Sequence, residues 1–201
     1  MRQRLLCSTI KGCMDTAHLR AATQAEHAAT EGTVPLMSSS LTLAQYGDTL
    51  ARMYRIVRAW DTWASANVPE DLQPILQSRR RACLLAGDLQ SLGLATPTED
   101  EVPHQRMQST VVAGDARSVF LGRMYVMEGS TLGGQLLARH VEQRFGFAEG
   151  QSDSYFRGYG ESTGERWREF KAYLEALPQE HADVVIASAR NMFMLFGEAM
   201  S

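Results

Sequence analysis

Apolar residues recur at three- and four-residue steps along most of this chain, which is the period of helices that bury one face. The clearest case is the stretch 41–67, in which the positions on this period are Leu43, Tyr46, Leu50, Met53, Tyr54, Val57 and Trp60. No stretch alternates apolar and polar residues for long enough to indicate a strand, and the sequence contains no internal repeat. The pattern therefore predicts an all-α protein.

The same period, together with residues that favour helix ends, defines the other expected helices. Besides 41–67, helices are expected over about 16–30, 70–92, 115–145, 165–177 and 182–200. Asp15 or Thr16 can cap the first of them, and Gly93 stands at the C-cap position after 70–92. We expect loops over 95–105, which holds two prolines and an acidic run, and over 145–164, which is rich in glycine and serine.

The length of 201 residues fits one domain, because it allows a sizeable core and the sequence shows no linker to a second one. We expect a tail or surface arm over 1–15 and a single multi-helix domain over 16–201. The formal net charge of -3 gives no general attraction to nucleic acid or to anionic membranes. One short basic run, Arg79 to Arg81, is expected on a solvated helix surface.

The three cysteines, Cys7, Cys13 and Cys83, match no metal-binding or redox spacing and are expected to be reduced thiols. The N-terminal stretch does not resemble a signal peptide, and no apolar run approaches 18 residues. We therefore expect a cytoplasmic protein, by default a monomer, with no nucleic-acid or membrane partner.

The segment "MEGSTLGGQLLARH" (127–140) carries three glycines inside a predicted helix. Each glycine costs roughly 1 kcal/mol relative to alanine in a helix interior, so an approach close to the backbone is expected here. Gly129 and Gly133 are four residues apart, as are Ser130 and Gly134, so these residues form a strip along the helix. Two explanations remain open: close packing of another helix, or a flat ligand that lies on the backbone and bonds to Ser130 or Thr131.

The first predicted helix, "HLRAATQAEHAATEG" (18–32), places Arg20, Thr23 and His27 on one face. Arg20 and His27 are seven residues apart, or about 10 Å along a helix. This offset is similar to the distance from a haem iron to its carboxylate edge, so one helix could supply an axial imidazole and a partner for a propionate. A surface or satisfied core histidine is the alternative.

Three segments together resemble the haem oxygenase family. "LRAATQAEH" (19–27) is similar to its proximal helix, "EGSTLGGQL" (128–136) to its distal helix, and "FMLFGE" (193–198) to a helix of its pocket wall. The resemblance covers about 17–200 and implies the family's all-α fold. It also implies that His27 ligates the iron and that Arg20 binds a propionate.

The other implied site residues lie on the distal helix and near the C-terminus. The resemblance maps the close backbone contacts onto Gly129, Gly133 and Gly134, where the helix is expected to kink, and a haem-touching aromatic onto Phe196. Ser130 stands where animal members carry an aspartate, as in the bacterial branch. Many relatives have a tyrosine and an arginine where this chain has Met124 and Val126. The candidates for the second propionate are therefore Arg123, Arg157, Arg168 and Lys171.

The implied activity is that of an oxidoreductase for which haem is both substrate and cofactor. With O2 and electrons from an external ferredoxin or reductase, the expected products are biliverdin, Fe2+ and CO. Glu31, one turn after His27, is the nearest candidate to accept the other ring proton of that histidine. Ordered water near Ser130 is the expected proton donor, and Glu128 is expected in solvent or paired with Arg123.

Three other functions remain open. A haem carrier or sensor would use the same fold and His27 without cleaving the ring. A thiamin-salvage hydrolase would need a nucleophilic cysteine, and Cys83 has no recognisable partner. In a purely structural bundle His27 would be replaceable. The remaining histidines, which lack the paired spacing of a metal site, are His18, His104, His140 and His181.

Overall fold

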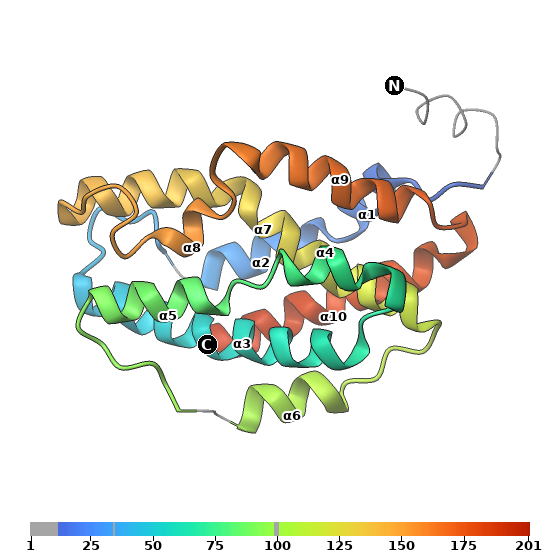
Figure 1. Cartoon of the computed structure of the whole chain (residues 1–201), viewed down its shortest axis with the longest axis horizontal. Helices are drawn as coiled ribbons and strands as arrows, with labels where there is room; N and C mark the ends of the chain where they lie inside the picture. Colours follow the sequence, from blue (N-terminus) through green and yellow to red (C-terminus); the bar gives the residue numbers. More distant parts are fainter. Residues whose placement is uncertain (1–11, 34, 99–100) are drawn as a thin grey trace.

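The computed structural model of the chain describes residues 12–33, 35–98 and 101–201, and it is built from helices throughout (Figure 1). Across these ranges the only extended pairing is an isolated bridge between Cys13 and Pro178. The prediction of an all-α fold is therefore confirmed. In chain order the α-helices are α1 (Thr16–Ala22), α2 (Gln24–Thr33), α3 (Leu43–Asn67), α4 (Gln73–Gln77), α5 (Ala82–Ser91), α6 (Glu101–Ser109), α7 (Ala116–Phe145), α8 (Ser154–Arg157), α9 (Thr163–Glu175) and α10 (Ala182–Met200).

The most extensive contact of the fold is the one that α10 makes along α7, and α10 also packs against α2. Gly122 lets α7 and α10 approach each other, since a Cβ there would lie 2.5 Å from the carbonyl oxygen of Val185. Ser188 Oγ on α10 donates to the carbonyl of Val119 at 2.6 Å, which fixes the same crossing. Around this pair, α5 and α6 pack on α3, while α8 and α9 pack on α7 (Figure 1).

Several helix ends lie where the sequence predicts them. Asp15 accepts from the N–H of Ala17 at 2.8 Å, and Thr42 forms a reciprocal capping box with Gln45 before α3. Asp115 caps α7, and Gly146 ends that helix in the left-handed conformation with φ 70°. The short polar side chains and glycines at these positions therefore set the boundaries of the long helices.

The first expected helix is divided into α1 and α2 at Thr23. The hydrogen bonds continue across the division, because Thr23 N–H donates to Leu19 O and His27 N–H donates to Thr23 O. The Thr23 hydroxyl also donates to Leu19 O at 2.9 Å, where it competes with the backbone, and the φ of Thr23 is −108°. Arg20 and His27 therefore lie in consecutive helices rather than in one.

Two other expectations differ from the structure. The helix expected over 70–92 is interrupted, with a 3-10 turn at Glu70–Leu72, then α4, then α5. The loop expected over 95–105 contains the start of α6, and with it His104. Pro103 is tolerated there because it lies in the first turn, where backbone N–H groups have no helical partner.

Residues 12–15 lie along the segment between α9 and α10. Met14 is buried, and its N–H donates to Leu177 O at 2.9 Å. Gln179 N–H donates to Gly12 O at 2.5 Å. These four residues of the expected arm are thus bonded to the helical domain, while positions 1–11, including Cys7, are outside the described residues.

We predict that Asp115→Ala lowers the free energy of unfolding by about 1 kcal/mol, because the variant loses the cap of α7. Burial raises the pKa of Asp115, but hydrogen bonds from Ser118 and His181 outweigh it and bring the pKa to about 2. A lowered folded-state pKa stabilises the protein above the unfolded value of 3.8, and this contribution is lost as the pH falls towards about 2.

Urea unfolding of both proteins at several pH values measures this difference, with Asp48→Ala on the exposed side of α3 as the control. The gap between the native chain and Asp115→Ala is expected to narrow below about pH 4. A gap that is unchanged down to pH 2 would contradict the assigned role of this carboxylate.

Candidate functional site

His27 lies on α2 with its side chain 54% exposed. Its ring meets the ring of Phe193 on α10 edge to face, with centroids 5.7 Å apart. Its Nδ1 is 3.5 Å from Glu31 Oε2, one turn along the helix. A proton on Nδ1 directed at this carboxylate leaves the lone pair of Nε2 available to a metal ion.

The helix that carries His27 depends on contacts with α10. All ten residues of α2 are described, and none of them is buried. Arg190 on α10 donates to the carbonyl of Ala22 at 2.7 Å and pairs with Glu26 at 3.0 Å. These bonds hold the junction of α1 and α2 immediately before His27.

Arg20 lies in the last turn of α1 and is exposed. Its charge affects the pKa of Tyr125 on α7. Burial raises the pKa of this phenol, whereas a hydrogen bond with Thr23 and the charge of Arg20 lower it. Tyr125, one turn before Gly129, therefore lies near the junction of α1 and α2.

The three glycines of the segment 127–140 of α7 have different surroundings. A Cβ at Gly134 would collide with the carbonyl oxygen of Phe156 on α8, so close packing explains this glycine. A Cβ at Gly129 would make an ordinary contact with Trp167 at 4.0 Å, and a Cβ at Gly133 would meet no described atom within 4 Å other than its chain neighbours and the backbone of its own helix. Packing within the protein therefore accounts for Gly134 but not for Gly133, and a ligand on the backbone at Gly133 stays a prediction.

Two exposed leucines lie beside the two glycines that a close contact does not explain. Leu132 and Leu136, on the same turns of α7, are 50% and 62% exposed. Exposed leucines next to bare backbone form a surface that a flat apolar ligand could cover. We call Gly129, Leu132, Gly133 and Leu136 the open strip of α7.

The charges behind α7 are arranged differently from the expectation. Glu128 was expected in solvent or paired with Arg123, but it is buried in an ion pair with Arg79. Tyr159 O–H donates to the other carboxylate oxygen of Glu128 at 2.8 Å. The expectation fails because Glu128 lies on the buried face of α7, where a charge requires a partner.

The basic run was also expected on a solvated surface, and this is wrong for two of its three members. Arg79 and Arg81 are 4% and 3% exposed, and Arg80 between them is exposed. Arg81 donates to Met127 O at 2.5 Å and to Ser130 Oγ at 3.2 Å. These arginines come from the break between α4 and α5, which turns alternate side chains inward.

Two candidates for the second propionate are engaged elsewhere. Arg123 is buried, and it donates to the carbonyls of Met107 and Thr110 and to the Asn191 side chain. Burial lowers the pKa of Arg123 to about 10. Arg157 forms ion pairs with Glu142, Glu149 and Asp153.

The other candidates for haem contacts, Arg168, Lys171 and Phe196, are exposed or half-buried. Arg168 on α9 is exposed, and Lys171, one turn further, is half-buried. Phe196 is half-buried on α10 and packs on the core, whereas Phe193 is the aromatic that contacts His27. Ser130 Oγ donates to Met127 O at 2.7 Å, so its hydrogen is directed along the helix.

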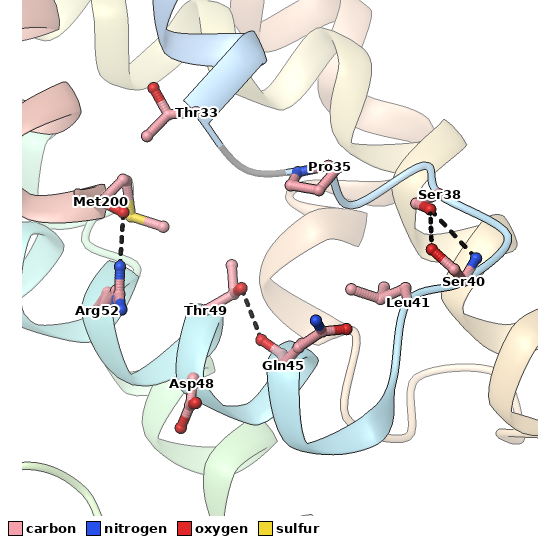
Figure 2. Close-up of a pocket in the computed structure, with 10 residues that line it drawn as sticks. All are labelled: Thr33, Pro35, Ser38, Ser40, Leu41, Gln45, Asp48, Thr49, Arg52 and Met200. Carbon is pink, nitrogen blue, oxygen red and sulfur yellow. Dashed lines mark hydrogen bonds between the residues drawn. The ribbon is translucent and has the colours of Figure 1, made fainter.

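A hollow of about 230 Å³ lies at the far end of α2, between Thr33, the segment 35–41, the first half of α3 and Met200 (Figure 2). Its polar groups are bonded to one another, as shown by Arg52 donating to Met200 O and Thr49 donating to Gln45 O. None of the predicted site residues is among those that line it. This hollow is therefore separate from the histidine and the open strip.

The described residues contain no group of three or more His, Cys, Asp or Glu side chains that could hold a metal ion. A single imidazole such as that of His27 can hold a metal ion whose other ligands come from a cofactor. The same part of the chain contains no helix with the length and apolarity needed to cross a bilayer.

Comparisons with known proteins show the family to which the chain belongs. The family model for heme oxygenase matches residues 15–201. A heme oxygenase of Xanthomonas campestris pv. campestris (strain 8004) is 32% identical over 155 residues, which cover 75% of this chain and 86% of that protein. The chain therefore belongs to the heme oxygenase family.

Solved structures show the same fold at lower sequence identity. Heme oxygenase from Leptospira interrogans superimposes with a TM-score of 0.77 at 20% identity, covering 92% of this chain and 97% of that one. The NO- and CO-bound heme oxygenase from Neisseria meningitidis superimposes with a TM-score of 0.69 at 21% identity, covering 92% of this chain and 88% of that one. For heme oxygenase-1 from Synechocystis sp. PCC6803 in complex with heme, the TM-score is 0.65 at 18% identity, covering 92% of this chain and 89% of that one.

We predict opposite effects of alanine at the two adjacent glycines of α7 on the haem-free protein. Gly133→Ala should stabilise it by about 1 kcal/mol, because the new methyl group meets open space and alanine favours helix. Gly134→Ala should destabilise it by about 1–3 kcal/mol through the clash with α8. Thermal unfolding measures both, and equal shifts of the two variants would rule out the assignment.

Proposed function

We propose that this protein cleaves the haem macrocycle with O2 and reducing equivalents to give biliverdin, Fe2+ and CO. His27 would hold the iron, and Arg20 would bind a propionate. The open strip of α7, with Gly129 and Gly133, would let the ring approach the backbone, and Phe196 would line the wall. Haem, when bound, supplies the iron that activates O2 and is also the molecule that is cleaved.

The observation that carries this proposal is the state of α2. A helix with no buried side chain gains little from the core, yet it is held on α10 with a half-exposed imidazole at its centre. A ligand that coordinates His27 and covers this side of α2 would supply the burial that the helix lacks. The relative from Synechocystis was solved with heme, which supports the choice of ligand.

The residues of this chain would divide the work as follows. Glu31 holds the His27 ring through Nδ1, and Gly129 and Gly133 let the backbone of α7 come close to the ring edge. Since the Ser130 hydrogen is used on Met127 O, the Ser130 oxygen can accept from a water molecule and orient it. Glu128 is tied to Arg79 and Tyr159 and does not act as a base, so the proton comes from ordered water.

We further propose that electrons come from a separate ferredoxin or reductase, and that the protein works as a cytoplasmic monomer. The alternative within the same fold is a haem carrier or sensor. The two differ in whether the ring survives reduction in air.

We predict that His27→Ala binds ferric haem at least about tenfold more weakly than the native protein, because the variant lacks the axial ligand. The control is His18→Ala, which removes an exposed histidine from α1. Titration followed by the visible spectrum of the haem gives both affinities.

After a reductant is added in air, the native protein and His18→Ala should lose the haem band and gain biliverdin absorption. A band that persists in the native protein would identify a carrier. An unchanged haem spectrum in His27→Ala would show that another residue ligates the iron.

A further inference from the structure

We infer that Arg81 is a positioning residue for the helix that faces the macrocycle, and that it fixes the turn of α7 from Met127 to Ser130. The inference rests on the proposed function, because that function makes the course of α7 matter for the reaction. It concerns a residue that lies outside α7, at the start of α5, 49 positions before Ser130.

The backbone at Arg81 is anchored independently of its side chain. Arg81 stands at the N-cap of α5, and the following N–H, that of Ala82, donates to Asp61 Oδ2 on α3 at 3.1 Å. Asp61 is itself buried. The guanidinium therefore reaches α7 from a turn that is itself hydrogen-bonded to α3.

The burial of this cation needs an explanation. A buried ion is unfavourable by several kcal/mol unless it is paired and hydrogen-bonded. The centre of the guanidinium lies 4.8 Å from the ring of Tyr155, and the carboxylates of Glu128 and Asp61 are near enough to favour its charge. Apolar residues of similar volume often stabilise a core as well as such a network does, so stability alone does not account for Arg81.

The bonds of Arg81 fall on one turn of α7. Met127 O accepts a hydrogen bond from the Arg81 guanidinium at 2.5 Å and another from the Ser130 hydroxyl at 2.7 Å. It is also the acceptor that the N–H of Thr131 uses in a regular α-helix. A carbonyl oxygen has two lone pairs, so the helical bond at this carbonyl is shared with side chains, and the Arg81 guanidinium holds the turn in place from outside the helix.

The next carbonyl is affected in the same way. Thr131 Oγ1 donates to Glu128 O at 2.7 Å, so two consecutive carbonyls bind side chains in addition to their helical partners. Helices change direction where side chains enter the ladder of hydrogen bonds. In Figure 1 the two halves of α7 do not share one straight axis.

Arg81 therefore does two things at the point where the open strip begins. It braces a turn whose own helical bond is shared, and it occupies one lone pair of Ser130 Oγ while the hydroxyl hydrogen stays on Met127 O. The side of Ser130 Oγ that remains can accept a bond from water. The orientation of that water, and the edge of the ring that α7 leaves open, both follow from the position of this turn.

The test compares Arg81→Met and Arg81→Lys with Arg80→Met, which removes the adjacent exposed arginine. Amide hydrogen exchange is measured on the haem-free proteins, so it does not depend on the proposed function. In Arg81→Met we expect exchange at least about fivefold faster at residues 130–135 than in the native chain, with α10 unchanged. Arg81→Lys keeps the charge but loses the planar guanidinium donors, so its exchange rate should be intermediate. The exchange rate of Arg80→Met should match that of the native chain.

Exchange in Arg81→Met that is unchanged, or that rises equally in α10, would overturn the positioning role. With haem, a reductant and air, Arg81→Met should give a mixture of biliverdin isomers and a lower kcat with KM changed less than about threefold. A single unaltered isomer would also overturn it. If the native protein forms no biliverdin, the proposed function fails, and the exchange measurement alone decides the role of Arg81.

Discussion

The contact of α10 with both α2 and α7 is the constraint on which the site depends. Phe193 meets the His27 ring and Arg190 holds the junction before it, while Gly122 lets α7 approach the same helix. The histidine helix has no buried residue of its own and so takes its position from α10. One buried helix thereby sets the places of both the imidazole and the glycine helix.

The second element of the account is the group of charges behind α7. Buried Arg79 neutralises buried Glu128, and Arg81 bonds to Met127 O, so a polar layer holds this part of α7 from outside the helix. Such layers specify one arrangement more than they stabilise it. The glycines make the surface of α7 accessible, and the polar layer determines where that surface lies.

The sequence predicts much of the fold and less of the site. Periodicity and caps such as Thr42, Asp115 and Gly146 define the long helices, because these signals are local. The break at Thr23 and the helix after residue 100 were missed, since a side-chain bond and tertiary contacts decide them. The family was identified correctly, while the roles of His27, Arg20 and the glycines remain proposals.

The buried arginines were missed because a run of three like charges is usually solvated. A signal was present in the partner residues. Glu128 falls four and seven positions after Met124 and Leu121, on the apolar face of its helix, and Asp61 falls four positions after the buried Val57. A buried carboxylate requires a partner, and Arg79 pairs with Glu128, while the charge of Asp61 favours the charge of Arg81.

A crystal structure of the ferric haem complex tests the central claim most directly. The account predicts His27 Nε2 on the iron and the backbone at Gly129 and Gly133 against the opposite face of the ring, and it is contradicted if another side chain ligates the iron or if that strip of α7 faces solvent.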